Sequence, residues 1–468
     1  MLFNSLHFLV FFIIITSLYY IIGQRFRWSL LLAASCYFYM AFIPIYILIL
    51  GFTIIVDYIA GIYIEKSRGN RRKLFLIFSL IANIGVLAIF KYYNFLNHNF
   101  SFLLHGFGLQ NPLPFLSILL PIGLSFHTFQ AMSYTIEVYR GNQIAERHLG
   151  IYSLYVMFYP QLVAGPIERP QNLMPQFREN HVFSFENFKD GLTQIAFGLF
   201  KKVVIADRLA IAVDYSFNNY TSQSGLSLAL AVIFYSFQIY CDFSGYSDIA
   251  IGSARIMGFK LMTNFNTPYF SRSISEFWKR WHISLSSWFR DYMYFSLGGN
   301  RVKKIRAYFN LFIVFLVSGL WHGANWTFVV WGSIHGLLIM IEKRIDIFKK
   351  KHKIIWRNKL IQSVQVLITF MLVSLAWIFF RAESLNKAMY VLDKIFNFSI
   401  SDKIDNSLNS VELIFSFGLI VMLIFKEKGF FKINTHNNIV FIIIIIMVSF
   451  SCYFFGVFNN RQFIYFQF

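Results

Sequence analysis

The chain has 468 residues, of which 57% are hydrophobic and 14% are charged, and its mean hydropathy is +0.55. Soluble domains do not reach this apolar content, so the composition indicates a polytopic membrane protein in a lipid bilayer. The net charge of +20 does not indicate nucleic-acid binding. The basic residues lie in short loops between apolar runs, and the chain has no soluble basic domain to hold a duplex.

Apolar runs of span length follow one another along the chain, beginning with a retained first span. We expect an all-α, polytopic transmembrane helical bundle with about eleven or twelve true crossings. No polar stretch is long enough to fold alone, so residues 1–468 are expected to form a single membrane domain. The runs are 2–22, 28–43, 45–64, 74–95, 115–138, 149–163, 190–213, 226–248, 305–322, 324–341, 360–380, 411–425 and 438–457.

Clusters of basic residues predict the topology. They lie at 25–27, 66–73, 343–357 and 426–432, and the excess of Lys and Arg on the cytoplasmic side of membrane proteins places these loops inside. The tail after Asn459 would then lie outside. The three cysteines, Cys36, Cys241 and Cys452, are scattered through separate apolar segments, so the sequence predicts no disulfide framework and no metal site.

Two segments, 162–190 and 241–306, are too rich in polar and helix-breaking residues to face lipid. Non-helical backbone is tolerated at membrane depth only where it faces protein or water. An irregular centre of this kind, wrapped by long apolar helices, predicts a cavity inside the membrane.

Residues 277–292 hold the densest mixture of Trp, charge and histidine. As one continuous helix they would place an apolar face on one side and His282 in a polar stripe on another. Such a helix suits the interface or a re-entrant position. Either it carries chemistry through His282, or it is an interfacial helix without chemistry. The apolar face would hold Phe277, Trp281, Leu285, Trp288 and Tyr292, and the polar stripe Lys279, His282, Ser286 and Arg290.

A second histidine, His322, lies in the run 308–341, which has no Lys, Arg, Asp or Glu. The run is longer than one crossing and shorter than two, so we expect a break at its Gly-rich centre. His322 would lie ~24 Å along a helix from Arg306. An ionisable group at this depth is a candidate for function, or else a structural histidine bonded to a carbonyl or to Asn325. His335 and His127 are expected to have packing or hydrogen-bonding roles.

A histidine kept neutral by burial is a suitable general base for an alcohol that attacks an activated acyl group. His282 could orient or polarise the reactants. The sequence has no GxSxG elbow, no cysteine near either histidine and no GxxxxGK[ST] loop. Direct transfer without a resident covalent nucleophile is therefore the simpler hypothesis.

Several motifs resemble those of the membrane-bound O-acyltransferases, and within them the branch of bacterial alginate and peptidoglycan O-acetyltransferases. The two principal motifs are WKRWHISLSSWFRDY (278–292) and GLWHGA (319–324). Supporting motifs are DFSGYSDIA (242–250), PQLVAGPI (160–167), WIFFRA (377–382) and the closing FIYFQF (463–468). They cover essentially the whole chain.

This resemblance implies re-entrant or interfacial helices around a central funnel or tunnel, with His322 catalytic and His282 its partner. It implies acetyl-CoA as cytoplasmic donor substrate, no permanently bound cofactor and a location in the bacterial inner membrane. It also implies a periplasmic partner transferase that esterifies a polysaccharide. Residues expected to shape the site are Asn325, Trp321, Arg280, Asp291, Asp242 and Asp248; the four charged residues among them could instead hold the site together by ion pairing.

Other functions stay open at this point. A transporter or flippase for an acyl carrier or glycan would also show buried polar residues and broken helices. A scaffold that only docks a periplasmic enzyme, and a D-alanyl transferase of teichoic acid synthesis, are further alternatives. The final acceptor, peptidoglycan or an alginate-like polysaccharide, is not decided by these motifs.

Overall fold

The computed structural model describes residues 1–117, 121, 123–163, 165–352, 358–399, 402–430, 435, 437–458 and 463–464. Every regular element in these ranges is a helix, so the prediction of an all-α polytopic protein is confirmed. The last four residues of the closing motif, 465–468, and most of the tail after Asn459 lie outside the described residues. Chain contacts divide the protein into two compact units, and the single domain expected from the sequence stays a prediction.

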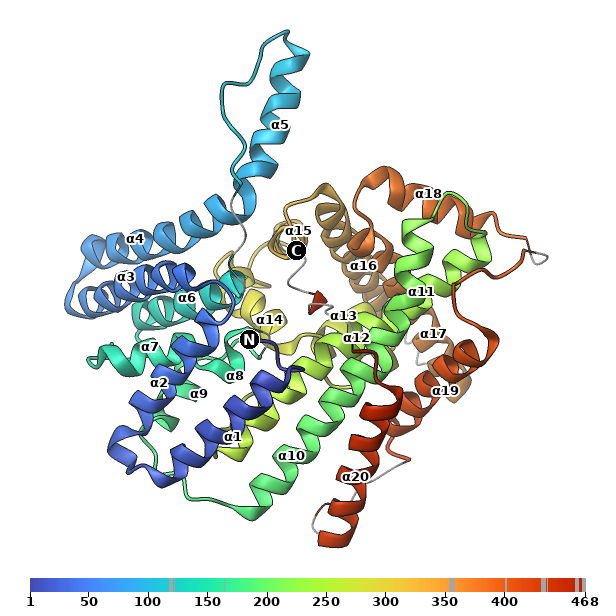
Figure 1. The fold of residues 1–468 in the computed structure, drawn as a ribbon. Coiled ribbons are helices and arrows are strands. Elements are labelled where there is room, and N and C mark those ends of the chain that lie inside the picture. The colour runs from blue at the N-terminus through green and yellow to red at the C-terminus, as the bar shows by residue number, and fades with distance from the viewer. Residues whose placement is uncertain are drawn as a thin grey trace. The chain divides into compact units, whose positions relative to one another are not determined.

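The first unit comprises residues 1–192 and 250–262. Helices α3, α4 and α6 pack side by side in it (Figure 1). A buried carboxylate joins two of them, because Asp57 of α3 accepts hydrogen bonds from Ser79 Oγ (2.6 Å) and Asn83 Nδ2 (2.8 Å) of α4. The elements are α1 (Leu6–Ile21), α2 (Gln24–Met40), η1 (Pro44–Tyr46), α3 (Ile47–Lys66), α4 (Gly69–Leu87), η2 (Ala88–Tyr92), α5 (Tyr93–Gly106), α6 (Leu124–Arg140), α7 (Leu149–Met157), α8 (Tyr159–Leu162) and α9 (Pro170–Gln176).

The second unit comprises residues 193–249 and 263–468 and holds both histidines of interest. Two helices, α10 (Phe185–Leu199) and α12 (Gly225–Ile256), run from one unit into the other. The remaining elements are η3 (Phe200–Ala206), α11 (Asp207–Asn218), η4 (Pro268–Phe270), α13 (Ile274–Arg280), α14 (Ile283–Trp288), η5 (Phe289–Tyr294), α15 (Lys304–His322), α16 (Trp326–Lys351), α17 (Lys359–Arg381), α18 (Leu385–Phe396), α19 (Ser410–Glu427) and α20 (Asn438–Phe455).

Six helices among the described residues are long and apolar enough to cross a membrane, and the shorter α1 is also apolar. In α12, 83% of the most apolar window is buried inside the protein, compared with 11% in α20. Helix α12 is therefore shielded from lipid, whereas α20 presents most of its surface outward. The six are Pro44–Lys66, Gly69–Gly106, Gly225–Ile256, Lys304–His322, Lys359–Arg381 and Asn438–Phe455.

Candidate functional site

His322 is the last residue of α15, and a short turn joins it to α16. The break expected at the Gly-rich centre is therefore confirmed. The two helices approach closely because glycines face each other: a Cβ on Gly319 would lie 2.2 Å from the carbonyl oxygen of Phe328, and one on Gly332 would lie 2.3 Å from that of Phe315. Small residues permit this backbone approach, which fixes where α15 ends and hence where His322 lies.

Aromatic rings surround the His322 imidazole. Its centroid lies 4.9 Å from that of Trp321, 5.0 Å from Trp331 and 5.2 Å from Phe380. The Trp331 indole in turn stacks on Trp377 at 5.6 Å. His322 is only 3% exposed, so the aromatic rings shield its imidazole from solvent.

Residues 277–292 do not form the continuous helix expected from the sequence, and that prediction is wrong. The segment is divided into α13, α14 and the π-helical turn η5, with the break at Trp281 and His282. His282 has φ of +43°, in the left-handed region that non-glycine residues rarely adopt. The expected polar stripe is lost as well, because His282 is fully buried while Lys279 and Arg290 are exposed. Strained backbone of this kind is common at functional sites.

The strained turn at His282 is held by the loop before η4. The amide of Ile283 donates to the carbonyl of Asn264 at 2.9 Å, and the amide of Asn266 donates to the carbonyl of Arg280 at 2.9 Å. The buried side chain of Asn264 also accepts a hydrogen bond from Ser284 Oγ at 2.6 Å. Sequence reasoning placed Asn264 only in a polar stretch, because its partners lie about twenty residues further along the chain.

The two histidines share a neighbour. The His282 ring lies 6.4 Å from the indole of Trp321, which in turn contacts His322. On its other side His282 meets Phe243 of α12, at 4.6 Å and edge-on. Burial lowers the pKa of His282 to about 3, so this ring is neutral at physiological pH. The structure therefore brings the two predicted histidines into one aromatic cluster around Trp321.

A cavity of about 530 Å³ opens beside this cluster, lined by α13, α14, η5, α15 and α16. Ser318 lines it one helical turn before His322, and Ile283 lines it directly after His282. Three basic residues, Lys279, Arg290 and Lys343, lie among its lining residues. The cavity combines an apolar wall with cations that attract an anionic ligand, and its volume is typical of small-molecule sites.

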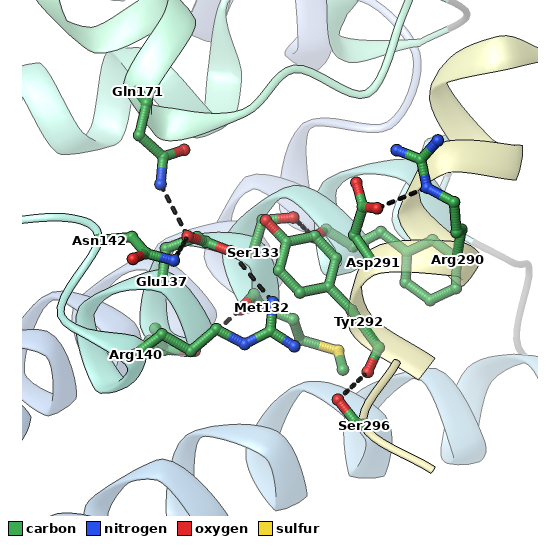
Figure 2. A network of polar contacts seen from close by, with 12 residues as sticks. Met132, Ser133, Glu137, Arg140, Asn142, Gln171, Arg290, Asp291, Tyr292 and Ser296 are labelled. Atoms are coloured by element: carbon green, nitrogen blue, oxygen red, sulfur yellow. Dashed lines mark hydrogen bonds and ion pairs between the residues drawn. The ribbon is translucent and has the colours of Figure 1, made fainter. Parts of the chain in front are cut away.

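Three of the expected site-shaping residues have structural partners. Asn325 caps α16, accepting the Thr327 amide at 3.0 Å and donating to the carbonyl of Glu383 at 2.9 Å. Arg280 forms an ion pair with Glu276 at 2.7 Å. Asp291 accepts from Arg290 Nε at 2.7 Å, as Figure 2 shows. These hydrogen bonds and ion pairs fix the positions of the three side chains, and their roles in the reaction stay predictions.

The two aspartates of the motif at 242–250 form ion pairs on α12. Asp242 pairs with the buried Lys202 at 2.8 Å, and its other oxygen accepts the amide of Ile464 at 2.9 Å. The same lysine pairs with Asp207 at 2.9 Å. Asp248 forms an ion pair with Lys201. These contacts hold α12, and with it Phe243, against the C-terminal segment and η3.

His335 of α16 accepts a hydrogen bond from Trp278 Nε1 at 3.3 Å and lies 5.0 Å from the Trp331 ring. Trp278 is itself part of the cavity wall. The sequence predicts a packing or hydrogen-bonding role for His335, and the contacts of His335 agree with that prediction. In the described part of the chain, no group of three or more His, Cys, Asp or Glu residues could hold a metal ion.

In the first unit, the polar residues of 162–190 are bonded to protein. Glu168 is fully buried, and its carboxylate accepts hydrogen bonds from the Met262 amide and the Asn172 side chain, both at 2.6 Å. The amides of Gln171 and Asn142 both donate to Glu137 at 2.9 Å (Figure 2). This segment therefore meets the expectation that it faces protein or water and not lipid.

The fold and this site define a polytopic helical membrane protein with two buried histidines beside a basic, largely apolar cavity. A family model described as "MBOAT, membrane-bound O-acyltransferase family" matches residues 143–381, a range that includes both histidines. The chain belongs to this family and is an acyltransferase. The family resemblance seen in the sequence motifs is thereby confirmed.

Named relatives support this assignment. The chain is 40% identical to a Pseudomonas aeruginosa protein named "Probable alginate O-acetylase AlgI", over 85% of this chain and 75% of that protein. It is 38% identical to a Helicobacter pylori "Peptidoglycan O-acetyltransferase", over 77% of this chain and 72% of that protein. It is 28% identical to a Bacillus subtilis "Teichoic acid D-alanyltransferase", over 69% and 82% of the two chains.

Proposed function

We propose that this protein takes an acetyl group from cytoplasmic acetyl-CoA and passes it across the bacterial inner membrane for O-acetylation of a cell-envelope polysaccharide. The names of the relatives at 38–40% identity support acetyl as the group and an envelope polysaccharide as the final acceptor. A periplasmic partner transferase would complete the esterification. The D-alanyl relatives are more distant, so D-alanyl transfer is the second candidate.

The position of His322 carries this proposal. Leu311, Phe315 and Ser318 line the cavity from one face of α15, and His322 follows one helical turn further along the same face, next to the cavity lining. In our mechanism, His322 takes the proton of an acceptor hydroxyl while the oxygen of that hydroxyl bonds to the acetyl carbonyl carbon. The carbon–sulfur bond breaks, and the departing CoA thiolate receives the proton from the His322 imidazolium. His282, neutral at physiological pH, would orient or polarise the reactants from the other side of Trp321.

The cations of the cavity support CoA as the donor. CoA carries phosphate groups at the end remote from its thioester, and Lys279, Arg290 and Lys343 would attract them. Lys343 belongs to the basic cluster 343–357, which the sequence places in the cytoplasm, where acetyl-CoA is made. Membership of an acyltransferase family favours this chemistry over transport or docking alone.

The test is transfer of labelled acetyl from acetyl-CoA by protein reconstituted in vesicles. The parent is compared with His322→Ala, His282→Ala and, as a matched control, the exposed His105→Ala, after each variant has been checked for folding. We expect His322→Ala to lose roughly 10²-fold or more of the rate and His282→Ala to be impaired. Normal transfer by folded His322→Ala would refute the general-base role, and a parent that never transfers acetyl would refute the proposed donor.

A further inference from the structure

A second cavity of the second unit shares no lining residue with the one beside the histidines. It lies between the α10–η3 segment, the end of α19 and the middle of α20, and its volume is about 340 Å³. This volume falls within the ~300–1,000 Å³ of small-molecule sites. Its wall is almost entirely apolar, formed mainly by Phe197, Phe200, Met422, Leu423, Ile444 and Val448.

The cavity lies beside a helix face that lipid would cover. On α20, Ile443, Ile446 and Phe450 are exposed, and Met447, which lines the cavity, is 63% exposed. Helix α20 is also one of the candidate membrane spans. A long hydrocarbon chain could therefore enter the cavity from the surrounding bilayer without crossing a polar surface.

Two lysines stand at this cavity, and they differ in their partners. Lys201 forms an ion pair with Asp248 and donates to Ser244 Oγ at 2.9 Å. Lys426 lies with Nζ 3.2 Å from the centroid of the Phe197 ring, and among the described residues no carboxylate lies within ion-pair distance of it. The neighbouring Glu427 carboxylate instead accepts a hydrogen bond from the Tyr240 hydroxyl. Among the described residues, Lys426 is thus a cation at the cavity that forms no ion pair, although the carboxylates of Asp248 and Glu427 act on it electrostatically from further away.

Lys426 belongs to a basic cluster at the end of an apolar helix. It lies in the last turn of α19, which ends at Glu427, and Lys428 and Lys432 come after it in the sequence. Basic clusters at the cytoplasmic end of a membrane helix attract anionic lipid headgroups. The cavity therefore offers an apolar site for a lipid chain together with a cation in the last turn of α19.

We propose that this cavity binds one anionic glycerophospholipid, with an acyl chain between η3, α19 and α20 and its phosphate group at Lys426. The apolar wall accounts for the chain, and the cation accounts for a preference for anionic over zwitterionic headgroups. This inference is independent of the acyl donor and acceptor proposed above, because it concerns other residues and no chemical step.

The test uses the full chain in phosphatidylcholine vesicles that contain a small fraction of a lipid with a photoactivatable acyl chain. The probe is either phosphatidylglycerol or phosphatidylcholine, and the labelled residues are located by peptide mass spectrometry. We expect phosphatidylglycerol to label the cavity residues of α19 and α20 in preference to phosphatidylcholine. Lys426→Gln should reduce this preference about fivefold, because one lysine contributes about 1 kcal/mol near an anionic headgroup.

Two further variants make the result decisive. Lys350→Gln removes an exposed lysine at the end of α16 and should leave labelling unchanged. Met447→Trp, at an exposed position that lines the cavity, should reduce cavity labelling by both lipids. Equal labelling by the two lipids in the parent, or an equal effect of Lys350→Gln and Lys426→Gln, would overturn the proposal. Labelling that Met447→Trp leaves intact would also overturn it.

Discussion

The imidazole of His282 packs edge-on against the ring of Phe243, with the centroids 4.6 Å apart and the planes at 87°. Phe243 belongs to α12, whose aspartates are fixed by Lys201 and Lys202. The burial of His282 thus depends on a helix far from it in sequence. A histidine buried in this way in a neutral form has consequences for stability and pH dependence.

The first prediction concerns pH. Because the pKa of His282 falls from 6.5 in the unfolded chain to about 3 in the folded protein, the unfolded state binds a proton that the folded state excludes between these values. The contribution of the neutral His282 to the free energy of unfolding is therefore fully present above pH 6.5. It is lost as the pH falls below this value, by at most ~1.4 kcal/mol per pH unit. We expect the Tm of purified protein to fall between pH 6.5 and 4.5, and His282→Gln to reduce that fall. The exposed His105→Gln should not; identical curves for all three proteins would contradict the prediction.

The second prediction concerns Asn264. Asn264→Ala removes the oxygen that accepts from Ser284 Oγ beside the strained His282 turn, at a cost of ~1–3 kcal/mol for a buried group left unsatisfied. We expect a lower Tm and a lower kcat for acetyl transfer, with KM for acetyl-CoA little changed, because His282 loses its position and the cavity keeps its cations. The matched control is the exposed Asn397→Ala. A change confined to KM would argue against a positioning role.

The third prediction distinguishes binding of the nucleotide end of acetyl-CoA from binding of its thioester end. Lys343→Gln and Lys279→Gln should each raise KM for acetyl-CoA up to about fivefold, the effect of ~1 kcal/mol for an exposed charge pair. Neither should change KM for S-acetylpantetheine, which lacks the nucleotide phosphates. Lys350→Gln is the control, because this lysine lies outside the cavity. If both donors responded equally, the lysines would act on the fold or on the thioester end.

The fourth prediction tests the close approach of α15 and α16. Gly319→Ala places a Cβ 2.2 Å from the carbonyl oxygen of Phe328, and side-chain rotation cannot relieve a clash with backbone. We expect loss of transfer activity and a lower Tm. Gly418→Ala on α19 meets no atom within 4 Å and should leave both unchanged or raise the Tm, because alanine is the better helix former. A tolerated Gly319→Ala would show that His322 does not depend on this packing.

The apolar runs and the two histidine motifs are local patterns, and the sequence by itself determined the features that depend on them. The all-α membrane class, the break before Asn325, the placement of the polar segment 162–190 against protein or water and the acyltransferase family are of this kind. A glycine-rich break in an uncharged run can be predicted because lipid leaves the backbone few alternatives to a helix.

Only the tertiary structure decided how His282 lies. Helical periodicity placed it on a polar stripe with Lys279 and Arg290, yet His282 lies in a left-handed turn with its ring buried. Hydrogen bonds that Asn264 accepts from Ile283 and Ser284 hold this turn. Helical periodicity carries no information about a contact between residues about twenty positions apart. At His282 such a contact overrides the local helical propensity. The aromatic contacts that join His282 and His322 through Trp321, and the cation of Lys426 at its apolar cavity, likewise depend on packing between distant segments, which the sequence order does not encode directly.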